Sequence, residues 1–266
     1  MLDRPIITLT TDFGLKDPFV GIMKGVILGI NPKAKIIDIS HNITPQNIFE
    51  AAHIISMGYK YFPPSTIHVI VVDPQVGSAR RPLLISSQGH YFIGPDNGVF
   101  TLVYEEQHVE VIHITSPHYY FPPKGPTFHG RDIFAPAAAW FSKGIESSKF
   151  GNLINDYVTL PMPKSRISDE TTVEGEVVYI DSFGNAITNI TKDNLDKLSP
   201  EFSKNRFRVI YRDNQLSLSN YYSQTESSDL SGVLNSFGFL ELFTYRGNAS
   251  DKFDIKIGDK VTVKLI

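Results

Sequence analysis

The chain has 266 residues, of which 41% are hydrophobic and 20% charged, and its formal net charge is −3. This composition is that of an ordinary globular protein, and the length allows one large domain or two modest ones. A slightly acidic chain offers no basic footprint for nucleic acid or an anionic membrane, so neither is an expected partner. The absence of cysteine excludes thiol catalysis, disulfides and cysteine-ligated zinc.

The sequence shows no sign of membrane insertion or export. The first residues carry an acid at position 3 and lack the apolar core of a signal peptide. The longest apolar stretches, such as residues 135–141, are too short to span a bilayer. We therefore expect a cytoplasmic protein.

The first 150 residues alternate between strand-like and helix-like segments. Asp17 and Pro18 predict the start of the first helix, and Thr44 and Pro45 predict the start of the second. Asp132 predicts the N-cap of a further helix that runs through the apolar residues after it. The predicted strands are residues 5–11, 35–40, 67–72, 82–87, 90–94 and 109–115, and residues 96–106 are typical of a further helix. This alternation predicts an α/β domain with a mostly parallel sheet, in which ligands bind at the carboxyl ends of the strands.

The pattern changes after a polar stretch at residues 155–172 that holds two prolines and has no clear period. Beyond it, short strands follow at residues 173–181, 186–190, 207–212, 216–220, 238–243 and 259–266, with only a brief helix near 191–198. Such a series predicts a small all-β barrel or sandwich. We predict an α/β domain at 1–160, a linker at 161–172 and a smaller β domain at 173–266.

Acidic residues end two of the predicted strands. Asp12 follows the first strand, where a carboxylate can accept hydrogen bonds from a ribose diol or simply form a turn. Asp73 ends the strand HVIVV, and Arg80 follows seven residues later. An acid beside an arginine stays ionised and fixes the guanidinium, so this pair indicates either a site or a structural salt bridge. Arg81 is expected to be a surface charge.

His129 is the histidine whose position most favours function. It precedes a predicted helix N-terminus, where backbone N–H groups disfavour the imidazolium form. A neutral histidine beside an acid and an arginine can orient or deprotonate a water molecule, although a single histidine is also common as a structural residue. The other histidines show no metal-ligand spacing, so metal catalysis is not expected.

Two turns of the β domain share the letters Ser-Phe-Gly. The segment DSFGNAITNI contains Asp181 and Asn185, which suit a hairpin turn, and Phe183, whose ring gains nothing from exposure in a turn. That ring can instead stack on a nucleobase. The segment NSFGFLEL repeats the pattern at Ser236 and Phe237.

Six segments in order resemble the S-adenosylmethionine hydrolases, also called SAM hydroxide adenosyltransferases, which are related to the SAM-dependent fluorinases and chlorinases. The segments are TDFGLKDPFVGIMKG, HVIVVDPQVGSARR, GPDNG, TFHGRDIFAPAAA, DSFGNAITNI and NSFGFLEL, and the resemblance spans roughly residues 6–266. It implies an N-terminal α/β domain, a C-terminal β-barrel and a homotrimer whose ligand lies between neighbouring subunits. It also implies hydrolysis of S-adenosylmethionine, a small-molecule substrate, to adenosine and L-methionine without a cofactor.

The resemblance assigns roles to residues at matching positions. It implies that Asp73, Arg80 and His129 activate water, and that Asp12 binds the ribose with Asp17 and Gly130 nearby. In the β domain it assigns the methionine ammonium to Asp181, adenine contacts to Asn185, stacking to Phe183 and Tyr222, and the methionine carboxylate to Ser236 and Phe237. The sulfonium leaves as neutral methionine, so the reaction needs no general acid, only an oriented oxygen nucleophile in line with ribose C5′.

The same resemblance leaves two alternatives to hydrolysis. A SAM-dependent halide adenosyltransferase is one, although the halogenase relatives lack this trio of Asp, Arg and His, and an ionised Asp73 would repel a halide. A non-catalytic adenosine-binding protein is the other. It would arise if Gln75, which stands where the family pattern has glycine, occupied a position that needs a positive φ and displaced the loop that carries Arg80.

Overall fold

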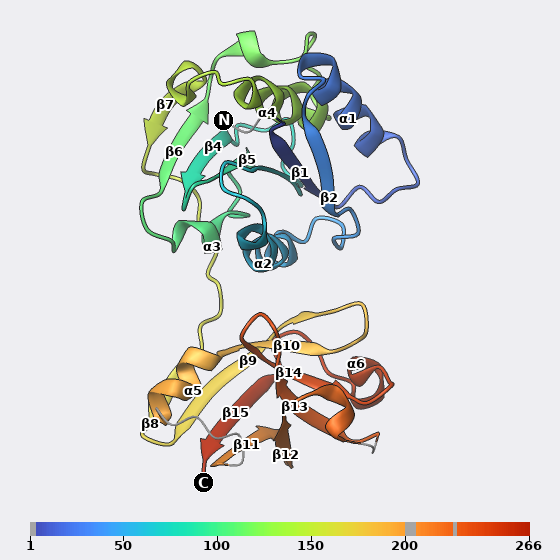
Figure 1. Cartoon of the computed structure of the whole chain (residues 1–266), viewed down its shortest axis with the longest axis vertical. Coiled ribbons are helices and arrows are strands. Elements are labelled where there is room, and N and C mark those ends of the chain that lie inside the picture. Colours follow the sequence, from blue (N-terminus) through green and yellow to red (C-terminus); the bar gives the residue numbers. More distant parts are fainter. Residues whose placement is uncertain (1–3, 200–205, 226–227) are drawn as a thin grey trace. The chain divides into compact units, whose positions relative to one another are not determined.

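The computed structural model describes residues 4–199, 206–225 and 228–266, and it divides the chain into two compact units, Met1–Pro161 and Met162–Ile266. Figure 1 shows an α/β unit and a β unit, each with its own elements. None of the helices in the described ranges is both long and apolar enough to cross a membrane.

The N-terminal unit is built on a sheet of seven strands in the order β2-β1-β3-β5-β4-β6-β7. Its strands are β1 (Ile6–Thr11), β2 (Lys35–Ser40), β3 (Ile67–Val71), β4 (Pro82–Ser87), β5 (His90–Pro95), β6 (Glu110–Ile114) and β7 (Gly151–Ile154). Its α-helices are α1 (Phe19–Ile30), α2 (Ile48–Gly58), α3 (Thr101–Tyr104) and α4 (Ala135–Ser142). The predicted α/β class and strands are confirmed, whereas β7 was not predicted.

The parallel arrangement covers only half of this sheet. Strands β2, β1, β3 and β5 pair in parallel, but β4, β6 and β7 add antiparallel pairings. The prediction of a mostly parallel sheet is therefore too broad. The reason is local, because β4 and β5 are joined by a two-residue turn at Gln88 and Gly89, both with positive φ, and so short a connection forces a hairpin.

Strand β3 shows why the sheet is rigid at its centre. All five of its residues are buried. Val69 and Val71 belong to the hydrophobic cluster that includes α1 and α4, whereas Ile70 and the following Val72 belong to the cluster that includes α2 and α3. Because side chains alternate across a strand, a continuous apolar run is what a strand covered on both faces requires.

Four predicted helix starts are wrong. Helix α3 starts at Thr101, after the positive φ of Gly98, and not at residue 96. Helix α1 starts at Phe19 rather than Pro18, since Pro18 is the N-cap and Asp17 does not cap it. Helix α2 starts at Ile48 because the positive φ of Gln46 interrupts the backbone, and the cap is Asn47 instead of Thr44.

Asp132 is not an N-cap either. It lies inside a π-helical turn, Gly130–Phe134, that precedes α4. Pro136 has no N–H to donate to the carbonyl of Asp132, and the backbone N–H of Phe121 occupies that carbonyl instead.

The C-terminal unit is the predicted β-barrel. Strands close in the order β9-β10-β14-β13-β12-β11-β15-β9, and β8 adds to β9 outside the ring. The strands are β8 (Arg166–Asp169), β9 (Thr172–Ile180), β10 (Ala186–Thr191), β11 (Phe207–Tyr211), β12 (Asn214–Ser219), β13 (Leu230–Leu234), β14 (Phe239–Thr244) and β15 (Lys260–Leu265). The helices are α5 (Lys192–Leu198) and α6 (Ala249–Phe253). Strand β8 lies within the stretch predicted as a linker, and it forms because it pairs with β9.

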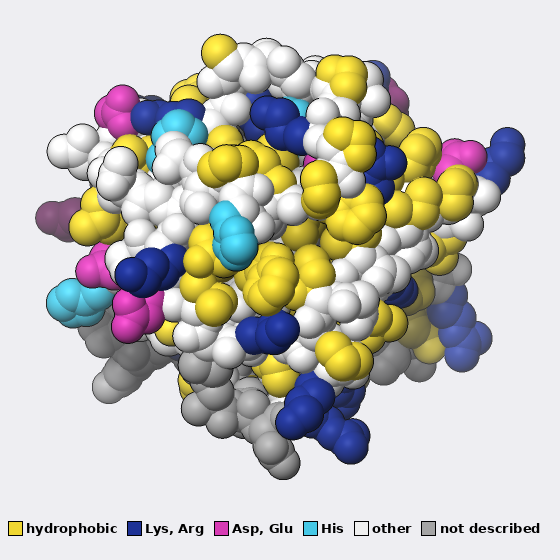
Figure 2. Space-filling view, turned by 90° about the horizontal axis from the view of Figure 1, so that it is seen from above, with side chains coloured by type: hydrophobic (Ala, Val, Ile, Leu, Met, Phe, Trp, Pro, Cys, Tyr) yellow, Lys and Arg dark blue, Asp and Glu magenta, His cyan; other side chains and the backbone are white. Residues whose placement is uncertain are grey.

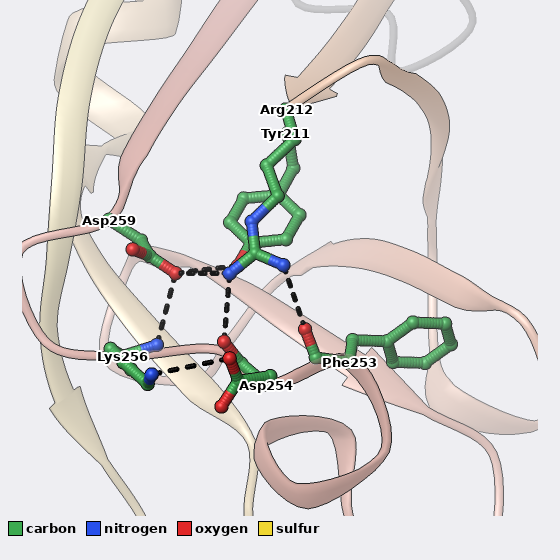
Figure 3. Close-up of polar contacts among 6 residues, drawn as sticks. All are labelled: Tyr211, Arg212, Phe253, Asp254, Lys256 and Asp259. Atoms are coloured by element: carbon green, nitrogen blue, oxygen red, sulfur yellow. Dashed lines mark hydrogen bonds and ion pairs between the residues drawn. The ribbon is translucent and has the colours of Figure 1, made fainter.

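One arginine ties two turns of the barrel together (Figure 3). Arg212, in the turn between β11 and β12, donates hydrogen bonds to the carbonyl oxygens of Phe253 and Asp254 at the end of α6, at 3.1 and 2.8 Å. It also contacts the carboxylate of Asp259, which accepts a 2.6 Å hydrogen bond from Tyr211. The unpaired carbonyls at the end of a helix are thereby satisfied by a cation, which the helix dipole favours.

Candidate active site

The N-terminal unit brings Asp73, Arg80 and His129 together. The guanidinium of Arg80 donates from Nε to Asp73 Oδ1 at 3.0 Å and from Nη2 to Asp73 Oδ2 at 2.5 Å. The same Nη2 lies 2.6 Å from Nδ1 of His129. The side chains of Arg80 and Asp73 are only 3% and 4% exposed. This is a buried, bidentate ion pair with a histidine against it, whereas most surface ion pairs are exposed and weak.

The arginine fixes the state of the histidine. A guanidinium has no acceptor, so the contact requires the Arg80 N–H to donate and His129 Nδ1 to accept. The remaining proton of a neutral imidazole is then on Nε2. Burial first, and the charge of Arg80 second, lower the pKa of His129 below its ordinary value. His129 is therefore a neutral imidazole that offers a donor at Nε2.

Glycine is required in this loop at position 77. Gly77 has a φ of +83°, and a Cβ there would lie 2.3 Å from the carbonyl oxygen of Pro126. Gln75 does not have a positive φ, so the departure from the family pattern does not strain the loop. The side chain of Asn97 donates to the carbonyl of Val72 at 2.9 Å and so anchors the residue before Asp73.

Arg81 is not the surface charge that was predicted. It is 23% exposed and bridges two acids, donating from Nε to Asp96 at 2.8 Å and from Nη1 to Asp156 at 2.7 Å. Asp96 in turn accepts a hydrogen bond from the backbone N–H of Val158 at 2.8 Å. Arg81 thus fastens the end of the loop to the chain beyond β7.

Asp12 lies at the same edge of the sheet as Asp73. Strands β1 and β3 pair in parallel with Thr11 opposite Val71, so the residues after them emerge side by side. Asp12 Oδ2 accepts a 2.8 Å hydrogen bond from the backbone N–H of Gln46. This bond holds the carboxylate at the carboxyl end of the strands, where a ligand is expected.

The other two binding residues predicted in this unit have different surroundings. Asp17 is exposed in the turn before α1. Gly130 is buried, and a Cβ there would lie 3.1 Å from the ring of Phe128 and 3.2 Å from the sulfur of Met23. Close packing thus explains the glycine. Sequence reasoning missed a cluster of rings beside it, formed by Phe13, Phe19 and Phe128 with centroids 5.3–5.9 Å apart.

The barrel has an open pocket of about 600 Å³ that collects four of the predicted binding residues. It is lined by Asp181, Phe183, Asn185, Tyr222, Thr244, Tyr245, Arg246 and Gly247. Phe183 is 75% exposed and Tyr222 is 45% exposed. Two partly free aromatic faces and a carboxylate in one pocket suit a cationic ligand with a flat ring system. Sequence reasoning did not find the segment 244–247.

Asp181 forms the turn that carries Phe183. Its Oδ1 accepts hydrogen bonds from the backbone N–H groups of Phe183 and Asn185, both at 2.9 Å. Gly184 between them has a φ of +81°, and a Cβ there would lie 2.0 Å from the side chain of Asn248. The predicted turn is present, and the exposed ring in it is held in place by the acid.

Ser236 and Phe237 lie in a second turn, between β13 and β14. Asn235 shapes this turn because its Oδ1 accepts from the backbone N–H groups of Phe237 and Phe239, at 3.0 and 3.1 Å. Sequence reasoning missed Glu241, a buried acid that accepts from the amide of Asn235 at 3.0 Å and the hydroxyl of Tyr222 at 2.8 Å. The sequence did offer a signal for Glu241, since it is an acid inside the otherwise apolar strand FLELFT.

Across residues 4–199, 206–225 and 228–266, no three His, Asp or Glu side chains gather as metal ligands.

Known proteins similar to this chain share both of its units. Family models described as the SAM hydroxide adenosyltransferase N-terminal and C-terminal domains match residues 7–151 and 175–262. An (R)-S-adenosyl-L-methionine hydrolase from Methanocaldococcus jannaschii is 38% identical, covering 97% of this chain and 95% of that protein. A fluorinase from Actinopolyspora mzabensis is 27% identical, covering 98% of this chain and 97% of that protein. A Thermotoga maritima protein of known crystal structure is 37% identical in sequence and superposes with a TM-score of 0.90. The match covers 97% of this chain and 99% of that chain.

Proposed function

The chain belongs to the SAM hydroxide adenosyltransferase family, and we propose that it hydrolyses S-adenosyl-L-methionine to adenosine and L-methionine. The observation that carries this proposal is the buried contact of Asp73, Arg80 and His129. These residues were singled out from the sequence as a water-activating trio, and they lie at one point of the fold. The 38% identity to a protein named (R)-S-adenosyl-L-methionine hydrolase supports the same substrate.

The reaction needs a positioned nucleophile more than an acid. The oxygen of water forms a bond to C5′ of the ribose while the C5′–S bond breaks. The electron pair of the C5′–S bond stays on sulfur, which gives neutral methionine. Because the leaving group is already activated by its positive charge, we propose that no cofactor takes part. Holding the oxygen in line with C5′ is the main task of the site, and such positioning can supply a large part of the rate enhancement.

The three residues divide this task. His129 offers the Nε2 proton as a hydrogen-bond donor, so it holds the water oxygen rather than accepting its proton. The proton passes to Asp73, whose oxygens each accept one bond from Arg80 and keep a further lone pair. Arg80 keeps Asp73 oriented and its positive charge favours hydroxide character in the attacking oxygen.

The remaining predicted residues bind the substrate. Asp12 takes the ribose hydroxyls, with Asp17 and Gly130 close by. In the barrel pocket, Asp181 takes the methionine ammonium, and the two exposed rings stack on adenine. Acidic side chains suit a substrate whose sulfonium and ammonium are both positive. Asn185 contacts adenine, and the turn with Ser236 and Phe237 takes the methionine carboxylate.

We further propose that the working form is a homotrimer in which neighbouring subunits share the ligand. Exposed hydrophobic side chains support an assembly, since the N-terminal unit exposes Leu15, Phe19 and Ile22, all in or before α1. Figure 2 shows hydrophobic side chains gathered on the face in view, among scattered Lys or Arg side chains and histidines. Apolar groups of this kind mark association surfaces. A cytoplasmic location remains a prediction.

The runner-up is a halide adenosyltransferase, because a fluorinase is among the relatives. An ionised Asp73 in the buried pair opposes it, since a carboxylate repels a halide ion. A binding protein without activity is disfavoured by the geometry of Gln75, which leaves Arg80 in contact with Asp73.

One assay separates the three functions. The protein is incubated with the (R) and (S) sulfonium epimers of S-adenosylmethionine, with and without chloride, and the products are identified by chromatography. We expect adenosine and methionine, faster from the (R) epimer for which the relative is named. Formation of 5′-chloro-5′-deoxyadenosine would establish the halide reaction, and nucleoside binding without turnover would establish a binding protein.

A further inference from the structure

Asp96 and Asn97, in the segment GPDNG, lie between the two ends of the loop that carries Asp73 and Arg80. This 73–80 loop leaves the sheet after β3 and returns to it at β4, and β5 is the strand between those two. Strand β5 is parallel to β3 and antiparallel to β4. The end of β3, the end of β5 and the start of β4 therefore meet at one edge of the sheet. The residues that follow β5 emerge between the residues that flank the loop.

Asn97 holds the beginning of the loop. Its buried side chain donates from Nδ2 to the carbonyl of Val72 at 2.9 Å, and its Oδ1 accepts from the backbone N–H of Val99 at 3.2 Å. A carbonyl only accepts and an N–H only donates, so the orientation of the amide is fixed from both sides. Because Val72 is the residue before Asp73, this bond determines where the loop leaves the sheet.

Asp96 holds the end of the loop. Its buried carboxylate places Oδ2 2.8 Å from Nε and 2.7 Å from Nη2 of Arg81. The backbone N–H of Asp96 also donates to the carbonyl of Arg81 at 2.8 Å. One residue thus fixes both the side chain and the backbone of Arg81, which directly follows Arg80.

The loop between these two ends is exposed and bonded mainly to itself. Residues 74, 75 and 77–79 are exposed. The backbone N–H of Val76 donates to the carbonyl of Asp73, and that of Ser78 donates to the carbonyl of Gln75. Such turn bonds shape the loop without tying it to the sheet, and the ion pair of Asp73 with Arg80 joins one end to the other. The position of the pair against His129 therefore depends on how the ends are held.

We infer that Asp96 and Asn97 are positioning residues for the chemical step, because together they clamp both ends of the 73–80 loop and so aim the ion pair of Asp73 and Arg80 at His129. This inference rests on the proposed function, in which these three residues activate water. The clamp acts through the ion pair, so its loss should lower kcat and leave KM almost unchanged. Residues needed only for folding would instead lower stability and leave the kcat of the folded protein intact.

Two neighbouring residues provide matched controls. Asp96 also uses Oδ1 to accept from the backbone N–H of Val158, and two residues later the N–H of Leu160 donates to Oγ1 of Thr101, both at 2.8 Å. Thr101 is buried like Asp96, and its hydroxyl donates to the carbonyl of Gly98. Thr101→Val therefore removes buried hydrogen bonds beside the clamp and leaves the clamp itself in place. Asp156→Asn removes the exposed partner of Arg81 and keeps Asp96.

The test measures kcat and KM for S-adenosylmethionine in Asp96→Asn, Asn97→Ala and the two controls, with circular dichroism and thermal unfolding to check each fold. Both oxygens of Asp96 accept from N–H donors, so an amide there must turn its own N–H groups toward one of them. Because a misplacement of about 1 Å can cost about a hundredfold in rate, we expect each clamp variant to lower kcat at least about tenfold and to keep KM within about threefold. The controls should keep kcat within about twofold. In an Asp73→Asn background the clamp changes should lower kcat by no more than about twofold further, since the pair that they position is already lost.

Folded clamp variants that keep the wild-type kcat would overturn the inference, as would a loss of kcat that is equally large in Thr101→Val or undiminished in the Asp73→Asn background. If Asp96→Asn does not fold, Arg81→Lys replaces it, since lysine keeps the charge but offers one nitrogen where Asp96 now meets two, and an unchanged kcat would then refute the clamp. A wild type that leaves S-adenosylmethionine intact would refute the proposed function and the inference with it. Wild-type turnover with unaffected clamp variants would refute the inference alone.

Discussion

Replacing Asp73 by asparagine tests the catalytic trio at its centre. The substitution keeps the shape of the side chain but turns one of the two oxygens that Arg80 grips into an N–H donor. Both side chains are at least 96% buried, so bulk solvent does not replace the lost hydrogen bond. Breaking one partner of a buried ion pair destabilises a protein by about 3–5 kcal/mol. Loss of a general base lowers the rate by about 10²–10⁴-fold.

We therefore expect Asp73→Asn to lower kcat at least a hundredfold and to destabilise the N-terminal unit by about 3 kcal/mol, at the lower end because asparagine can still accept one of the two bonds. Product formation from S-adenosylmethionine and urea unfolding measure the two effects. Asp156→Asn is the control, since Asp156 is 73% exposed in its pair with Arg81 and an exposed ion pair contributes little to stability. If Asp73→Asn turned over within threefold of the wild type, neither its role as base nor its role in holding Arg80 would survive.

Three further predictions follow from other contacts. His129→Gln, which keeps an N–H donor, should retain at least ten times the kcat of His129→Ala, and equal rates would disprove donation from Nε2. Burial, with the charge of His90 second, lowers the pKa of His68 to about 3, so between pH 6.5 and pH 3 only the unfolded chain binds a proton at this residue. The free energy of unfolding should therefore fall as the pH drops through this window, by at most about 5 kcal/mol. Urea unfolding at a series of pH values measures this, and a His68→Leu variant that kept the full pH dependence would refute it. Gly77→Ala should abolish most turnover whereas Gln75→Gly should leave it within twofold, and the reverse order would show that position 75 controls the loop.

The sequence predicted the division into an α/β part and a barrel because each has a clear pattern. Strand β3 is apolar throughout since both faces are covered, and the barrel strands are short and separated by turn residues. The sequence also placed Asp12 and Asp73 at strand ends, and the parallel pairing of β1 with β3 brings those ends to one edge. That Arg80 reaches both Asp73 and His129 depends on loop geometry that no local pattern records.

The features that were missed depend on contacts between distant residues. The π-helical turn after His129 forms because Pro136 has no N–H to donate to the carbonyl of Asp132. That carbonyl instead accepts a hydrogen bond from the N–H of Phe121, eleven residues away in the sequence. Glu241 looked like one polar residue in a short strand, and its partners Tyr222 and Asn235 come from two separate segments. Such residues acquire a role only when the fold brings their partners together.

The origin of the new oxygen in adenosine tests the central claim most directly. The protein is incubated with S-adenosylmethionine in H₂¹⁸O, and the adenosine is analysed by mass spectrometry with fragmentation of the ribose. If water attacks C5′ at the site of Asp73, Arg80 and His129, the 5′-oxygen carries the label in proportion to its enrichment in the solvent, and Asp73→Asn loses this product. Adenosine without label, or label that forms equally fast in Asp73→Asn, would contradict the account.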